Sequence, residues 1–105
     1  MDEIFVRSAD VPWEQSEELP ANLKRKILRR GGDGRPRVGL VKLEPGFEAE
    51  GHSHDHAENH YVLEGMYESL GREFPAGSYH FIPKSVSHGP FRSASGALIL
   101  VVWGD

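Results

Sequence analysis

Short apolar or alternating segments separated by turn residues make up most of the chain from residue 38 onward. The segments cover residues 38–43, 60–63, 67–70, 79–82 and 98–103, and the residues between them include the turn formers Pro45-Gly46, Gly65 and Gly71. Alternation with a period of two places successive side chains on opposite faces, as in half-buried β-strands. The last segment is a β-branched run that ends in Trp103, which is typical of a buried strand.

The first third of the chain extends the same pattern. Residues 12–22 carry turn formers and carboxylates without helical periodicity, so we expect an N-terminal arm or one helical turn. Residues 23–30 alternate in part, and Gly-Gly-Asp-Gly at 31–34 then predicts a hairpin turn. Several short strands without a long helix predict an all-β sandwich or barrel of the jelly-roll type. We expect a single domain over residues 1–105, with an arm at 1–22 and a barrel at 23–105.

Composition narrows the function classes. A chain of 105 residues supports one core, and the absence of cysteine excludes disulfides and thiolate metal sites. A net charge of −4 argues against a general nucleic-acid partner, because binding to phosphates needs a cationic surface. The first 13 residues lack the pattern of a signal peptide, and no apolar run reaches the roughly 20 residues of a membrane span. We therefore expect a cytoplasmic protein with a small-molecule ligand and neither a nucleic-acid nor a membrane partner.

Histidines cluster in the middle of the sequence. Four of the six histidines fall within nine positions, in the segment Gly-His-Ser-His-Asp-His-Ala-Glu-Asn-His at 51–60. On a strand, residues two apart share a face, so His52 and His54 can present two imidazoles to one point inside a barrel. A turn at 55–57 would let Glu58 return on the neighbouring strand and supply an oxygen ligand. The alternatives are that the histidines decorate a surface loop, or that a bound metal is only structural or adventitious.

The spacing of these residues matches two sequence motifs. The pattern G-x5-H-x-H-x3-E-x6-G is met by Gly46, His52, His54, Glu58 and Gly65. The pattern G-x5-P-x-G-x2-H-x3-N is met by Gly77, Pro83 and His88, with Ser85 in place of the second glycine and Arg92 in place of the asparagine. In both motifs the chain resembles the cupin superfamily, also called RmlC-like.

This resemblance implies a double-stranded β-helix that holds one divalent transition-metal ion (Fe, Zn, Mn, Ni or Co) through His52, His54, Glu58 and His88. Three imidazoles and one carboxylate suit such ions, and six-coordinate geometry would leave two positions open. Further matches at 12–13, 43–46, 61–65, 75–79 and 88–90 resemble one branch of small cupins. That branch includes the cupin domain of some anti-sigma factors and oxygenases that cleave diketones.

Two residues are candidates for catalytic roles. His60 shares strand parity with Glu58 and should face the interior, as a hydrogen-bond partner, a proton shuttle, a further ligand or an ordinary core histidine. Arg92 shares parity with His88 if the strand is regular, and it could bind a carboxylate or enolate; an exposed rim position is the alternative. We expect His56 at the rim and His80 in a surface or packing role. Most of the large aromatic residues are expected in the core: Tyr61, Phe74, Phe81, Phe91 and Trp103.

Together these features predict a metal-dependent, dioxygenase-type enzyme for a small enolisable or carboxylate substrate. The alternatives are a Lewis-acid isomerase, lyase or cyclase, and a metal-bearing binding or sensing module without catalysis. We also expect a homodimer, because small open barrels expose strand edges that a partner can cover. A strand at residues 4–7 is the candidate for exchange between the two copies.

Overall fold

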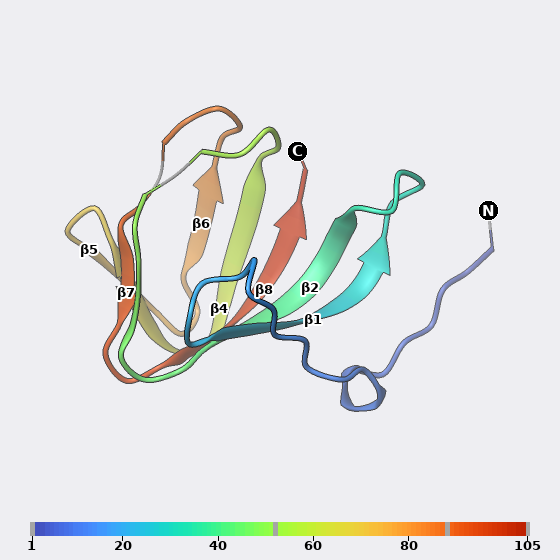
Figure 1. The fold of residues 1–105 in the computed structure, drawn as a ribbon, viewed down its shortest axis with the longest axis horizontal. Helices are drawn as coiled ribbons and strands as arrows, with labels where there is room; N and C mark the ends of the chain where they lie inside the picture. The colour runs from blue at the N-terminus through green and yellow to red at the C-terminus, as the bar shows by residue number, and fades with distance from the viewer. Residues whose placement is uncertain (1, 52, 88, 105) are drawn as a thin grey trace.

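The computed structural model describes residues 2–51, 53–87 and 89–104, so the predicted ligands His52 and His88 lie outside the described residues (Figure 1). The described chain contains one short 3-10 helix, η1 (Ser8–Asp10), and is otherwise built from strands. The strands are β1 (Leu23–Arg30), β2 (Pro36–Leu43), β3 (Phe47–Ala49), β4 (Glu58–Ser69), β5 (Arg72–Pro75), β6 (Tyr79–Ile82), β7 (Phe91–Ser93) and β8 (Ala97–Trp103). No helix among the described residues is long and apolar enough to cross a membrane.

All strand pairs are antiparallel, and β4 links the two halves of the sheet. The order is β1-β2-β8-β4-β7-β3, with β5 and β6 also paired to β4. The first residues of β4 pair with β6 and β8, whereas its last residues pair with β5 and β7. The result is a curled antiparallel sheet, the double-stranded β-helix expected from the sequence.

The curl of the sheet encloses an interior, and the N-terminal arm crosses its open side. Figure 1 shows the strands bending round this interior, with the blue arm running past β1 and β2 before it enters β1. Glu14 forms an isolated antiparallel bridge with Arg25 of β1, which fixes the arm to the sheet edge. Leu19 and Pro20 of the arm line the internal cavity. The arm is therefore part of the cavity wall.

The core follows from alternation along the strands. In β8 the side chains of Ala97, Ile99 and Val101 are buried, while the intervening residues are more exposed. These three side chains form one apolar cluster with Leu43, Phe47, Val62 and Tyr67. Branched and aromatic side chains on the inner face of each strand thus make the hydrophobic layer on which the sheet closes.

Several strands were predicted at nearly their observed limits, and others were missed. The strands predicted at 23–30, 38–43, 79–82 and 98–103 correspond to β1, β2, β6 and β8. The prediction of two separate segments around Gly65 is wrong, because β4 continues through this glycine, which adopts a φ of 75°. The strand predicted at residues 4–7 is also absent, since these residues belong to no strand or helix.

The outer surface of β4, β6 and β8 carries exposed apolar side chains. Tyr61 and Phe81, which were expected in the core, are each 45% exposed, whereas Phe74, Phe91 and Trp103 do pack against the core. Tyr61 pairs across the sheet with Tyr79, which is 60% exposed. Because directly paired residues share a face, these side chains form one outer apolar face with the exposed Val102 of β8.

Candidate metal centre and its cavity

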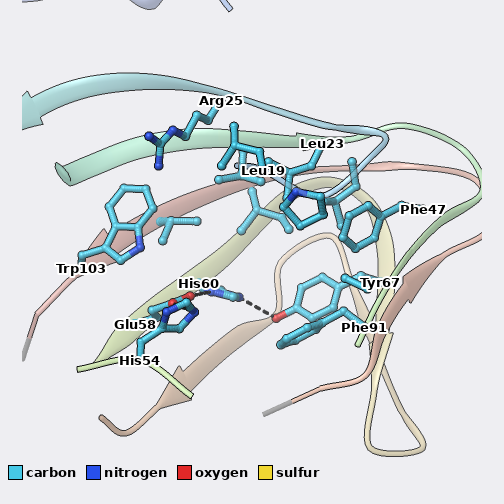
Figure 2. A pocket seen from close by; sticks show the side chains of 16 residues that line it. Leu19, Leu23, Arg25, Phe47, His54, Glu58, His60, Tyr67, Phe91 and Trp103 are labelled. Atoms are coloured by element: carbon cyan, nitrogen blue, oxygen red, sulfur yellow. Dashed lines mark hydrogen bonds and ion pairs between the residues drawn. The ribbon is translucent and has the colours of Figure 1, made fainter. Parts of the chain in front are cut away.

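An apolar cavity of about 200 Å3 occupies the interior of the curled sheet (Figure 2). Its walls are mainly aliphatic and aromatic, and its ionisable lining residues are His54, Glu58, His60, Tyr67 and Arg25. Pockets for drug-sized ligands span roughly 300–1,000 Å3, so this cavity suits a smaller molecule. A few polar groups converging in an apolar cavity are typical of a small-molecule site.

Glu58, the first residue of β4, is the centre of the polar group at one end of the cavity. The residue is only 7% exposed. Its Oε2 lies 2.9 Å from Nε2 of His54, and its Oε1 lies 2.9 Å from Nε2 of His60. His60 is buried and faces the interior, as its shared parity with Glu58 predicts. The carboxylate is therefore held between two imidazoles.

A chain of hydrogen bonds continues from Glu58 through the interior. His60 Nδ1 lies 3.1 Å from the Tyr67 hydroxyl, which in turn lies 2.8 Å from His80 Nδ1. An ionised carboxylate only accepts, so His60 donates to Glu58 through Nε2. The Tyr67 hydroxyl can donate to one of the two flanking histidine nitrogens and accept from the other. The His60 ring, held on its other side by Tyr67, fixes the orientation of Glu58 Oε1.

The environment keeps the far end of this chain uncharged near neutral pH. Burial raises the pKa of the Tyr67 hydroxyl well above its usual range, and the nearby charge of Glu58 raises it further. Burial also lowers the pKa of His80, and His60 and Arg72 lower it further, while Glu58 opposes them. Tyr67 therefore remains a phenol, and His80 a neutral imidazole that packs on Phe74 with ring centroids 4.3 Å apart. The expected packing role of His80 agrees with this position.

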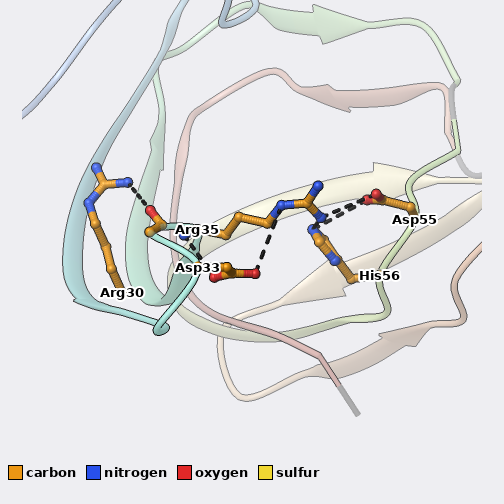
Figure 3. A network of polar contacts seen from close by, with 6 residues as sticks. Arg30, Asp33, Arg35, Asp55 and His56 are labelled. Atoms are coloured by element: carbon orange, nitrogen blue, oxygen red, sulfur yellow. Dashed lines mark hydrogen bonds and ion pairs between the residues drawn. The ribbon is translucent and has the colours of Figure 1, made fainter.

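His54 lies in a loop and not on a strand, contrary to the sequence prediction. The loop joins β3 to β4, and the backbone oxygen of His54 accepts a hydrogen bond of 2.7 Å from the Ser85 nitrogen. Figure 3 shows a second anchor, in which Arg35 Nη1 lies 3.2 Å from Asp55 Oδ2 and 3.4 Å from His56 Nε2. These contacts hold the loop to the hairpin between β1 and β2. His56 takes part in this surface network, as its expected rim position implies.

Arg92 points away from the cavity. Its side chain is 64% exposed, and its Nε lies 3.7 Å from Glu68 Oε2 on the outer side of the sheet. The neighbouring Phe91 lines the cavity instead. The parity prediction counted a regular strand from His88, but β7 begins only at Phe91, after Gly89 with a φ of 93°. The expectation that Arg92 reaches the barrel interior is therefore wrong.

The donor atoms in the described part of the site fit a transition-metal ion. Within residues 2–51, 53–87 and 89–104, no group of three or more His, Cys, Asp or Glu side chains could hold a metal. His54 and Glu58, however, bring one nitrogen and one oxygen to 2.9 Å from each other. Adjacent ligands of an octahedral ion with bonds of about 2.1 Å lie about 3.0 Å apart. Two of the four predicted ligands thus have the separation of one coordination edge.

Sequence reasoning missed two residues of this site. Arg25 of β1 lines the cavity, but it stands in the basic run Lys-Arg-Lys at 24–26, a pattern typical of a solvated strand face. Tyr67 was treated only as part of an apolar segment, yet its hydroxyl joins two histidines. Tyr67 and Ser69 are both buried on β4, but a serine at the alternate position gave no sequence signal that this face turns inward.

The curled antiparallel sheet, with its interior histidine and glutamate side chains, defines a cupin. Over residues 1–105 the chain matches the family model described as the ChrR Cupin-like domain, and it therefore belongs to that family. No curated protein matches the chain.

Solved structures of cupins share the fold. The polyketide cyclase RemF from Streptomyces resistomycificus is 21% identical, with a TM-score of 0.77 over 100% of this chain and 81% of that one. An RmlC-like cupin from Shewanella frigidimarina is 25% identical, with a TM-score of 0.75 over 97% and 90% of the two chains. An acetylacetone dioxygenase from Acinetobacter johnsonii is 15% identical, with a TM-score of 0.83 over 98% and 74%. These similarities establish the double-stranded β-helix.

Proposed function

We propose that this cupin is a metal-dependent enzyme of the dioxygenase type that acts on a small enolisable or carboxylate substrate. One divalent transition-metal ion is held by His52, His54, Glu58 and His88. The observation that carries the proposal is the 2.9 Å approach of His54 Nε2 to Glu58 Oε2 at one end of an apolar cavity. The similarity to an acetylacetone dioxygenase favours this chemistry among the activities found on the fold.

When bound, the metal ion supplies positive charge that stabilises an enolate and open positions for substrate or dioxygen. The chain's own residues prepare the site for it. Glu58 and His54 hold the ion, and His60 keeps one carboxylate oxygen oriented through its Nε2 proton. The role proposed for His60 is therefore to position Glu58, because its two ring nitrogens contact Glu58 and the Tyr67 hydroxyl. The apolar walls exclude water, which strengthens the electrostatic interactions of these groups.

The metal content of protein purified without chelator tests the proposal. We expect close to one equivalent of a divalent transition metal per chain, measured by elemental mass spectrometry. The ion should be released below about pH 6, because a protonated imidazole cannot ligate. Unchanged retention at pH 4.5, or metal-free protein that gains no ion on addition of Fe(II) or Zn(II), would contradict the proposal.

The identity of the metal separates the candidate activities. Bound Fe(II) with consumption of dioxygen in the presence of a β-diketone supports the oxygenase. Bound Zn(II) without consumption of dioxygen favours Lewis-acid isomerase, lyase or cyclase chemistry, for which the similarity to the cyclase RemF is the supporting comparison. Ligand binding without any turnover favours a binding or sensing module.

We further propose that the protein is a cytoplasmic homodimer. The outer apolar face supports the dimer. Tyr61, Tyr79 and Phe81 are exposed on adjacent strands, and contiguous aromatic surface of this kind is typical of protein interfaces. Sedimentation velocity should show a dimer for the wild type and a monomer for Phe81→Glu, because a buried unpaired charge opposes association. The variant Leu70→Glu, in the exposed turn between β4 and β5, is the control and should remain dimeric. A monomeric wild type would refute the dimer.

A further inference from the structure

A cationic side chain lines the cavity on the side opposite the Glu58 group. Figure 2 shows Arg25 extending from β1 toward Trp103, with His54, Glu58 and His60 across the cavity from it. The Arg25 side chain is 27% exposed, so most of it is removed from solvent. A guanidinium remains charged at all physiological pH values, and it is rarely placed beside apolar walls without an anionic partner.

One anionic partner is present, and it leaves part of the guanidinium unused. Arg25 Nε donates to Glu14 Oε1 over 2.6 Å. The backbones of the two residues are joined by reciprocal hydrogen bonds of 2.7 and 3.0 Å, so the arm holds the Arg25 side chain in place. Among the described residues, the two terminal nitrogens of Arg25 have no hydrogen-bond partner. A guanidinium has five donor protons, and four of them belong to these nitrogens.

The remaining donors match a carboxylate. Two parallel N–H groups at the end of a guanidinium bind the two oxygens of a carboxylate, a geometry that combines strength with orientation. Glu14 does not line the cavity, and its side chain is 44% exposed, so water screens its charge. Among the described side chains that line the cavity, Arg25 is therefore the one with a permanent positive charge.

The walls between the two ends are apolar. Val41, Ile99 and Val101 line the cavity, and Trp103 lies beside the Arg25 end. A ligand that fills this space needs an apolar body, an anionic group for the guanidinium, and a polar group that faces His54 and Glu58. A volume of about 200 Å3 limits the body to a small ring or a short branched chain.

We propose that Arg25 is the specificity-determining residue of the cavity and selects a small organic carboxylate, whose apolar body lies between Arg25 and the Glu58 group. This inference rests on the proposed function, since it names the substrate class of the same site. It assigns to Arg25 the anion-binding role that the sequence had suggested for Arg92. It also makes Glu14 a competitor, because its carboxylate shares the guanidinium with the ligand.

Binding of benzoate and its uncharged analogue benzamide tests the inference. Both probes are titrated by NMR into the full chain, first as purified and then after treatment with chelator, so that carboxylate binding to a metal is separated from binding to Arg25. In metal-free protein, Arg25→Gln should weaken benzoate binding by about tenfold or more, the loss expected for hydrogen bonds to a charged group. Benzamide binding should change by less than about twofold, because the amide gains little from the positive charge.

Three further variants make the result specific. Glu14→Gln should strengthen benzoate binding by about two- to threefold, because it removes the competing negative charge while its amide oxygen can still accept from Nε. Arg25→Lys, which keeps the charge but loses the fork, should lie between the wild type and Arg25→Gln. Arg29→Gln removes an exposed cation from the same strand and should bind benzoate like the wild type.

The outcomes separate this inference from the proposed function. Equal loss of benzoate and benzamide in Arg25→Gln, wild-type affinity in that variant, or no benzoate binding by the wild type would overturn the role of Arg25. If Arg25→Gln does not fold, Arg25→Lys and Glu14→Gln decide by the same comparison. Metal-free wild type that cannot be loaded, yet binds benzoate through Arg25, would refute only the metal-dependent function. Metal loading without any effect of Arg25 would refute only the selection of a carboxylate.

Discussion

Glu58→Gln is expected to lower the affinity for a divalent metal by at least about 100-fold. Loss of a group that merely orients a ligand costs about 10–100-fold, and removal of a charged ligand costs more. The amide has nearly the shape of the carboxylate, so the buried site between His54 and His60 remains filled. Competition against a chromogenic chelator measures the affinity, and thermal unfolding of the metal-free variants confirms that they fold.

Glu68→Gln is the matched control for this change. Glu68 lies on the same strand, but its side chain is 43% exposed and its ion pair among the described residues is with Arg92. This variant should retain the metal affinity of the wild type. If Glu58→Gln and Glu68→Gln bind metal equally well, Glu58 is not a ligand and the proposed centre fails. His54→Ala should behave like Glu58→Gln, since it removes the other end of the 2.9 Å contact.

Gly65→Ala is expected to cause the largest loss of stability. Gly65 has a φ of 75°, and a Cβ there would lie 2.1 Å from the backbone oxygen of Gly96 and 2.8 Å from the Cα of Ala97. The left-handed conformation costs about 1–2 kcal/mol for a residue with a side chain. The overlap with backbone of β8 and its preceding turn adds about 1–3 kcal/mol, because the paired strands must separate. Urea unfolding of the metal-free protein should therefore show a loss of about 2–5 kcal/mol.

Gly77→Ala separates the two contributions. Gly77 also has a positive φ, of 91°, but no atom lies within 4 Å of the position of its Cβ. This variant should lose only the conformational share, about 1–2 kcal/mol. Equal losses in the two variants would mean that the close approach of β4 to β8 does not limit the residue at position 65.

These glycines show why motif spacing predicted the fold well. A motif records backbone conformation and close approach, and both properties recur wherever the same sheet closes. Gly46, Gly65 and Gly77 all have positive φ values. The departure from the motif at Ser85 fits the same rule, because this serine has a φ of 61°, in the region that glycine usually occupies. The motif therefore marked the positions of positive φ correctly, including the one that serine occupies in this chain.

Other features could not be predicted from the sequence, because they depend on contacts between distant segments. The strands β3, β5 and β7 have three or four residues each, too few for alternation to be recognised, and they exist because β4 and its neighbours pair with them. Exposed aromatic residues on β4 and β6 looked like core residues, because composition alone does not distinguish the two faces of a strand. Arg25 shares strand parity with Leu23, which also lines the cavity, but its place in a basic run gave no sign that it faces inward.

The site shows the same division between local and distant information. His54 and Glu58 were identified by spacing, and their side chains do meet. His54 reaches Glu58 from a loop, so the strand geometry assumed for His54 was wrong although the pair was right. Arg92 failed because its parity was counted across Gly89, where the backbone departs from a strand. Parity arguments hold only within one uninterrupted strand.

The arm that supplies Leu19 and Pro20 to the cavity also carries Glu14, the partner of Arg25. A stretch with almost no regular secondary structure thus contributes both hydrophobic wall and charge balance to the binding compartment. Substitutions there could retune ligand preference while every strand of the barrel stays unchanged. A shortened form starting at β1 would lack this part of the cavity wall and the charge partner of Arg25, and so would bind ligands differently.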